Sequence, residues 1–307
     1  MKTAMLSRRH LMTAAVTLPI LPAFSRSAHA SAEMLGTSSA TFDRFKLGDF
    51  EVTTLLAGTR IFDKPQETYG MNVDAAEFAA ISEAAFIPAD KAQSYFTPTV
   101  VNTGNELVLF DTGLAPEAMT GALDAAGYSP DQVDIVVITH MHGDHIGGLM
   151  GDGAETFGNA RYVTGSAEHN HWMGAGNENF DAKVRPLNEK MTFLEDGGTV
   201  VSGLTAVLCP GHTPGHMGFM VESGGRQIMI TGDLANHPIW SVENPDWEVR
   251  FDMDKATAAQ SRRKVLDMLA ADRVPFIGYH MPFPAIGYVE TRDNGYRYIP
   301  ASYQMAM

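Results

Sequence analysis

The chain has 307 residues, of which 45% are hydrophobic, which is enough for one large globular domain or two small ones. Acidic residues outnumber basic residues by 36 to 22, and the resulting formal charge of −14 argues against nucleic acid and anionic membranes as partners. No apolar run is long enough for a transmembrane helix, so we expect no insertion into a membrane.

The N-terminal segment 1–30 has the features of an export signal. A basic start with an arginine pair at 8–9 is followed by an apolar stretch to Phe24 and by an A-x-A cleavage site at 28–30. The arginine pair resembles a twin-arginine signal, and an ordinary secretory leader is the alternative. The sequence therefore predicts a signal peptide and a periplasmic or secreted protein.

Residues 31–46 are predicted to form a Ser- and Ala-rich arm with little to bury, ahead of a folded domain over 47–307. An alternating pattern over 48–56 predicts the first strand. The long stretch from 62 to 96 contains chain-breaking residues around an Ala-rich helix near 75–85. Segments of this size in compact domains usually serve as lids or binding loops.

Further along, a hairpin over 97–111 and a helix over 115–126 precede a β-branched strand over 135–139. The segment 140–145 follows that strand directly and reads HMHGDH. In extended backbone its first two histidines point the same way and can reach one cation, while the acid and the last histidine turn towards a second. A His-rich surface loop is the alternative. The position of the segment at the end of an apolar strand favours a metal site.

Three later strand ends carry further metal-binding residue types. The strand over 203–208 leads into a tight Gly- and Pro-rich loop with His212. Asp233 follows a strand over 226–231, and His280 follows a strand over 274–278, with a helix expected over 255–271 between them. An acid after a strand is often a helix cap or a turn residue, but several such endings in one chain favour a site for two cations.

With these motifs, the chain from about residue 45 to its end resembles the metallo-β-lactamase superfamily. The resemblance implies an α/β (α+β) fold, a four-layer αβ/βα sandwich. It also implies two divalent cations, with zinc ranked above manganese, cobalt and iron. The ligands that it implies are His140, His142 and His212 for the first cation, Asp144, His145 and His280 for the second, and Asp233 as the bridge.

The resemblance also assigns roles around these ligands. Asp111 matches an acid that orients a ligand imidazole, and His216 is expected beside the ligands without binding a cation. Asp144 and Asp233 are expected to act in catalysis. Two cations can generate hydroxide from water at neutral pH, so no serine or cysteine nucleophile is required.

The substrate pocket is predicted less directly. Trp172 and Phe180 match aromatic positions that line the leaving-group pocket of methyl parathion hydrolase, and His237 and Met141 are further candidates for the pocket wall. Another phenylalanine of that pocket has no counterpart. Asn236 stands where the better-known acyl-homoserine lactonases place a tyrosine.

Within the superfamily, the chain is similar to the group of methyl parathion hydrolase and related lactonases and arylesterases. The segments 282–287 and 295–300 discriminate best, because they contribute no metal ligand. We expect hydrolysis of a lactone, including an acyl-homoserine lactone, or of an aryl ester. An organophosphate triester is the alternative, and a β-lactamase or a mononuclear-iron persulfide dioxygenase ranks lower. The expected partner is a small-molecule substrate, and a homodimer fits the sequence.

Overall fold

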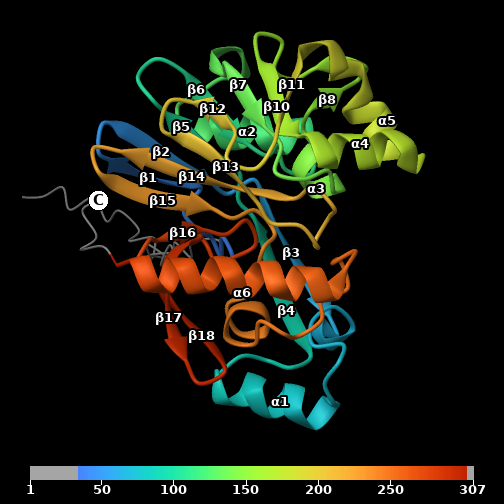
Figure 1. Ribbon diagram of the computed structural model, residues 1–307, viewed down its shortest axis with the longest axis vertical. Helices are drawn as coiled ribbons and strands as arrows, with labels where there is room; N and C mark the ends of the chain where they lie inside the picture. Colours follow the sequence, from blue (N-terminus) through green and yellow to red (C-terminus); the bar gives the residue numbers. More distant parts are fainter. Residues whose placement is uncertain (1–33, 303–307) are drawn as a thin grey trace, which may run out of the picture. The chain divides into compact units, whose positions relative to one another are not determined.

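Two seven-stranded mixed sheets form the centre of the compact unit that begins at Ser39 (Figure 1). The computed structural model describes residues 34–302. The first sheet contains, in spatial order, β1 (Phe42–Leu47), β2 (Phe50–Leu55), β5 (Thr99–Asn102), β6 (Leu107–Phe110), β7 (Ile135–Val137), β10 (Arg161–Gly165) and β11 (Met191–Leu194). The second contains β12 (Thr199–Val201), β13 (Leu204–Leu208), β14 (Met217–Ser223), β15 (Arg226–Ile230), β16 (Phe276–Ile277), β17 (Ile286–Arg292) and β18 (Gly295–Pro300).

Helices and two small hairpins complete the described chain. The α-helices are α1 (Ala75–Ala84), α2 (Pro116–Ala125), α3 (Gly143–Ile146), α4 (Ser166–Ala175), α5 (Glu178–Lys183) and α6 (Lys255–Asp272). Shorter helical turns are η1 (Pro65–Glu67), η2 (Pro130–Gln132), η3 (Arg185–Lys190) and the π-helix η4 (Pro238–Glu243). The hairpins pair β3 (Gly58–Asp63) with β4 (Lys91–Phe96) and β8 (Met150–Gly151) with β9 (Ala154–Glu155).

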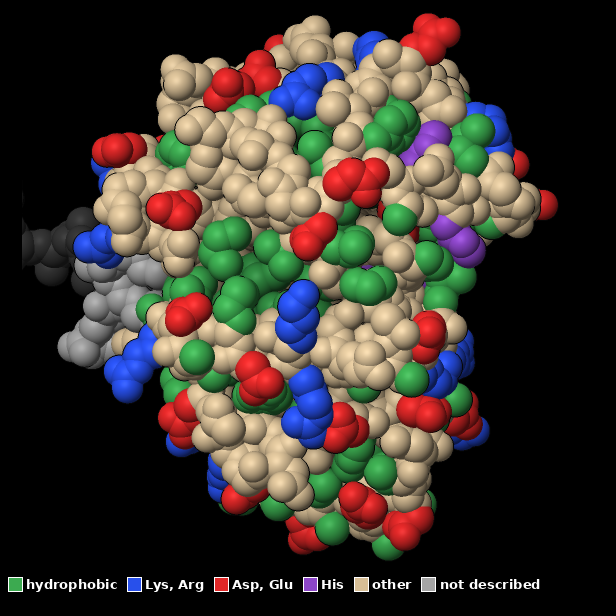
Figure 2. Space-filling view, in the orientation of Figure 1, with side chains coloured by type: hydrophobic (Ala, Val, Ile, Leu, Met, Phe, Trp, Pro, Cys, Tyr) green, Lys and Arg blue, Asp and Glu red, His purple; other side chains and the backbone are tan. Residues whose placement is uncertain are grey.

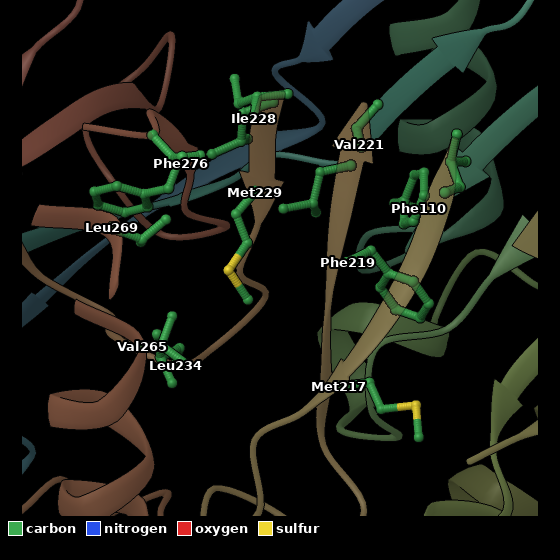
Figure 3. Close-up of a cluster of buried hydrophobic side chains, with 14 of the residues drawn as sticks. Phe110, Met217, Phe219, Val221, Ile228, Met229, Leu234, Val265, Leu269 and Phe276 are labelled. Atoms are coloured by element: carbon green, nitrogen blue, oxygen red, sulfur yellow. The ribbon is translucent and has the colours of Figure 1, made fainter. Parts of the chain in front are cut away.

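The middle of the first sheet is buried on both faces, and two of its strands, β6 and β7, are apolar at every position. Successive side chains of a strand point to opposite faces, so Val108 and Phe110 of β6 enter a central core, while Leu107 and Leu109 enter an outer core. In the central core, the rings of Phe110 and Phe219 meet edge-to-face with centroids 5.3 Å apart (Figure 3). The two sheets therefore pack face to face.

Helices cover the outer faces of the two sheets. Met119 of α2, Trp172 of α4 and Phe180 of α5 belong to the outer core on the first sheet. On the second sheet, Val265 and Leu269 of α6 pack into the central core from the other side (Figures 1 and 3). The predicted four-layer αβ/βα sandwich is confirmed.

The segment over 62–96, predicted as a lid or binding loop, has regular structure and a core of its own. It supplies η1, α1, β4 and the end of β3. Phe78 of α1 stacks between Trp240 and Trp247, with ring centroids 5.0 and 5.6 Å away. The stacking fixes this segment against the chain that follows β15.

Two boundaries differ from the prediction or fall outside the described chain. The predicted arm over 31–46 overlaps β1, which pairs with β2 along its whole length. Most of its side chains remain partly or fully exposed, which explains why the sequence shows no strong strand pattern there. The predicted signal over 1–30 lies outside the described residues. Within 34–302, no helix has the length and apolarity that crossing a membrane requires.

Candidate metal centre

The predicted metal ligands come together where loops from both sheets meet. His140, Asp233 and His280 each lie three residues beyond the end of a strand, namely β7, β15 and β16. β15 and β16 are parallel neighbours, so their carboxyl ends lie at the same edge. All seven predicted ligands fall into three overlapping groups whose ligand atoms lie within 4.8 Å of one another: His140, His142 and His212; His140, His145 and Asp233; Asp144, His145 and His280.

The first group places three imidazole nitrogens in a triangle. His140 Nε2 lies 3.1 Å from His142 Nδ1 and 3.1 Å from His212 Nε2, and the latter two lie 2.9 Å apart. Tetrahedral zinc with ordinary zinc–nitrogen bonds separates its nitrogen ligands by roughly 3.3 Å. The triangle therefore fits one cation.

The Asp233 carboxylate connects this triangle to the group of Asp144, His145 and His280. Its Oδ2 lies 3.3 Å from His212 Nε2 and 3.2 Å from His280 Nε2. Its Oδ1 lies 3.1 Å from His145 Nε2, but the geometry is not that of a hydrogen bond. Both atoms are buried, and neither has a hydrogen-bond partner. Buried polar atoms are rarely left unpaired, and these two fit coordination of a cation. His280 Nε2 and Asp144 Oδ2, 3.3 Å apart, complete the group with His145.

Asp111 fixes the orientation of His145. Its Oδ2 accepts the Nδ1 proton of His145 at 2.8 Å, and both carboxylate oxygens also accept from Thr139, from its N–H and its hydroxyl, at 2.9 Å. The Tyr279 ring packs on His145 with centroids 3.9 Å apart. The Tyr279 hydroxyl donates to the Asp144 backbone carbonyl at 2.5 Å. These contacts leave Nε2 of His145 directed at the site.

The His216 side chain holds the backbone of Asp233 in place. The His216 Nδ1–H donates to the carbonyl of Cys209 at 3.1 Å, and Nε2 accepts the Asp233 N–H at 3.0 Å. Both ring nitrogens are therefore occupied. Gly232 has φ +52°, and a Cβ there would lie 2.8 Å from His216 Nε2, so this close approach requires glycine.

Asp252 and Arg262 support His212, and sequence reasoning missed both. Asp252 Oδ1 accepts from His212 Nδ1 at 2.8 Å, and its Oδ2 accepts from the Arg262 guanidinium at 2.9 Å. The other two guanidinium nitrogens of Arg262 donate to the carbonyls of Leu234 and Pro245 at 2.9 and 2.6 Å. The one available signal was an arginine on the buried face of a helix. Glu168, buried in the first turn of α4, was missed as well.

Burial and charge separate the protonation states of these groups. Burial and neighbouring imidazoles lower the pKa of His140 well below its usual range and that of His142 to about 3. Burial also opposes protonation of His212 and His280, but Asp233 and a second carboxylate beside each outweigh it and raise their pKa values to about 9 and about 10. Despite burial, adjacent histidines hold the pKa of Asp233 well below its usual range. Metal binding requires ionised carboxylates and neutral imidazoles.

The predicted pocket residues are less exposed than expected. Trp172 is 7% exposed, and its indole lies edge-on to His142 with centroids 6.0 Å apart. Phe180 and Met141 are buried in the outer core, because α5 and the 140–145 loop direct them inward, and their place in the pocket stays a prediction.

His237 stacks on Trp240 with centroids 3.9 Å apart. It lines a largely apolar cavity of about 440 Å³ with Pro282 and Phe283.

On the face drawn in Figure 2, Lys and Arg side chains are interspersed with Asp and Glu rather than gathered into a patch.

Solved hydrolases share this fold over nearly their whole length. AidC, a dizinc quorum-quenching lactonase solved with the product N-hexanoyl-L-homoserine, is 26% identical, with a TM-score of 0.79 over 86% of this chain and 98% of AidC. The hydrolase AbOPH is 24% identical, with a TM-score of 0.80 over 87% of this chain and 100% of AbOPH, which shows the fold alone. This chain combines that fold with three overlapping groups of His and Asp side chains that could hold metal ions.

Sequence comparison gives the family. Residues 97–276 match the model of the Metallo-beta-lactamase superfamily, and the chain belongs to this superfamily. An N-acyl homoserine lactonase of Bacillus sp. is 26% identical over 166 residues, 53% of this chain and 62% of the lactonase. Protein YobT of Bacillus subtilis is 30% identical over 142 residues, 44% of this chain and 59% of YobT. The chain thus spans about six-tenths of these curated relatives.

Proposed function

We propose that the protein is a dinuclear metal hydrolase that cleaves a lactone, such as an N-acyl homoserine lactone, or an aryl ester. The observation that carries this proposal is the position of the Asp233 carboxylate. It contacts His212 on one side and His145 and His280 on the other, and its Oδ1 has no hydrogen-bond partner. A carboxylate in this position can bridge two cations.

In this proposal the seven residues divide between the cations as the resemblance to the superfamily implies. His140, His142 and His212 would hold the first, Asp144, His145 and His280 the second, and Asp233 would contact both. Two cations held there would supply a water of lowered pKa and would polarise the carbonyl oxygen of an ester or lactone.

The remaining residues orient these groups and control protons. Asp111 and Asp252 hold the Nδ1 protons of His145 and His212, so that each Nε2 faces the site. The Asp144 side chain is 24% exposed, against 4% for Asp233. We assign to Asp144 the transfer of a proton from the attacking water to the leaving oxygen, because it is the more accessible carboxylate.

The lactone and ester assignment rests on relatives and on one side chain. AidC is a quorum-quenching lactonase solved with the product N-hexanoyl-L-homoserine, and the Bacillus protein is an N-acyl homoserine lactonase. The indole of Trp172 beside His142 offers an apolar surface to an acyl or aryl group. Similarity to AbOPH shows the fold alone, so a phosphotriester ranks second.

A substrate panel tests the proposal. The metal-loaded protein would be assayed with N-hexanoyl-homoserine lactone, a δ-lactone, an aryl acetate, an aryl phosphotriester and a chromogenic cephalosporin. We expect the highest kcat/KM with the lactones or the aryl ester, and loss of turnover in Asp233→Ala. Preference for the phosphotriester or the cephalosporin would overturn the substrate assignment, and full turnover in Asp233→Ala would overturn the mechanism.

We also propose export, on the basis of the arginine pair and the A-x-A site within residues 1–30. Fractionation of expressing cells should place the mature protein outside the cytoplasm, with residue 31 at its N-terminus. Lys at both Arg8 and Arg9 should retain the precursor inside. Export of that double variant at the normal rate would contradict the twin-arginine assignment.

A further inference from the structure

Glu168 is a fully buried carboxylate next to the ligand groups but outside them. It lies in the first turn of α4, which begins directly after β10. Because β10 is the parallel neighbour of β7, this turn lies beside the loop that carries His140. A buried carboxylate needs hydrogen-bond donors, and these show what Glu168 holds.

The Oε1 atom of Glu168 binds the loop between the first two ligands. It accepts the backbone N–H of Met141, the residue between His140 and His142, at 2.9 Å. The same atom accepts the indole N–H of Trp172 at 2.6 Å. One oxygen therefore fixes both the first ligand loop and the aromatic side chain beside His142.

The Oε2 atom binds the loop that carries the third ligand. It accepts the Thr213 hydroxyl at 2.7 Å and the Gly215 N–H at 3.0 Å. A Cβ at Gly215 would lie 2.0 Å from the Glu168 backbone nitrogen, so this loop packs directly on the start of α4. All four partners are donors, and a carboxylate can accept from four.

We propose that Glu168 is the positioning residue of the first cation site. Its carboxylate sets the separation of the loop at 140–142 and the loop at 212–215, whose imidazole nitrogens lie 2.9 to 3.1 Å apart. The same carboxylate also holds the indole of Trp172, so Glu168 links the separation of the loops to the position of this side chain beside His142. This inference rests on the proposed two-cation function.

Just outside the two loops, the Met217 N–H donates to the Thr139 carbonyl at 3.0 Å. That bond lies outside the ligand-bearing stretches and would act as a hinge if Glu168 were lost. The Glu168→Gln variant keeps the size of the side chain but turns one acceptor into a donor. Two of the four donors would then face an N–H group.

The test measures cobalt(II) binding to the metal-free chain by competition with a chromophoric chelator, together with the visible absorption of the bound ion. In Glu168→Gln we expect one of two bound equivalents to weaken by roughly 10- to 100-fold, with a changed spectrum. Thr213→Val, which removes one of the four bonds, should weaken the same equivalent by less. Trp172→Phe, which removes another of the four bonds, should weaken the same equivalent by a similar amount and also alter KM. Glu178→Gln, on the exposed start of α5, is the matched control.

The outcomes separate three accounts. Wild-type affinity and spectrum in Glu168→Gln, with only a lowered melting temperature of the metal-free chain, would mean that Glu168 serves the fold alone and would overturn the inference. If Glu168→Gln does not fold, Thr213→Val decides, because unchanged cobalt affinity there contradicts a positioning role. A wild-type chain that binds no cobalt at all would instead overturn the proposed function.

Discussion

Replacing Asp252 by Asn removes a negative charge from a place where both members of an ion pair are buried. The side chains of Asp252 and Arg262 are each 1% exposed and lie 2.9 Å apart. Breaking a buried pair by removing one charge costs about 3–5 kcal/mol, because the other charge stays buried without compensation. We therefore expect Asp252→Asn to lower the free energy of unfolding of the metal-free protein by about 3–5 kcal/mol.

Arg263, the residue after Arg262 in α6, provides the control. Arg263 pairs with Asp246, but these side chains are 37% and 62% exposed. An exposed pair contributes about 0–1 kcal/mol, so Asp246→Asn should be nearly neutral. Urea unfolding followed by circular dichroism measures both variants. If they differ by less than about 1 kcal/mol, the buried pair does not stabilise the fold in the way described.

Three further predictions concern the site and the core. With pKa values of about 9 and about 10, His212 and His280 are protonated at pH 7 without metal, so cation binding should release protons and strengthen as the pH rises. Calorimetry in two buffers of different ionisation enthalpy measures this release, and identical heats would contradict it. Gly232→Ala forces a Cβ against His216, and we expect metal loss with about 1–3 kcal/mol of destabilisation in urea unfolding. Wild-type metal content in that variant would refute the close-approach argument. Phe219→Ala should cost about 3–5 kcal/mol in the same assay, and a cost below about 1 kcal/mol would mean that the central core is misassigned.

The strands of the central core were predictable because their patterns are strong. β6 and β7 are apolar at every position, and the hairpin between β5 and β6 has a recognisable polar turn. β1 was missed because it lies at the edge of its sheet, where only Leu47 is fully buried. Its backbone pairing with β2 stabilises it, and backbone pairing leaves little trace in sequence.

The ligand groups were predictable because each ligand follows a strand closely. The supporting residues that were missed come from elsewhere in the chain: Asp252 from a loop, Arg262 and Glu168 from helices. Apart from the place of Arg262 on the buried face of its helix, nothing in their local sequence distinguishes them from ordinary charged residues. The burial of Phe180 was not predictable because it depends on how α5 packs against the first sheet, which is a tertiary property.

The claim that Asp233 joins two cations in one site is tested most directly by metal content. Elemental analysis of the purified protein, measured beside lactone turnover, should give two cations per chain in the wild type. In Asp233→Ala we expect both bound metal and turnover to fall together. A wild-type chain that binds a single cation at full activity, or an Asp233→Ala variant that keeps two cations and full turnover, would contradict the account.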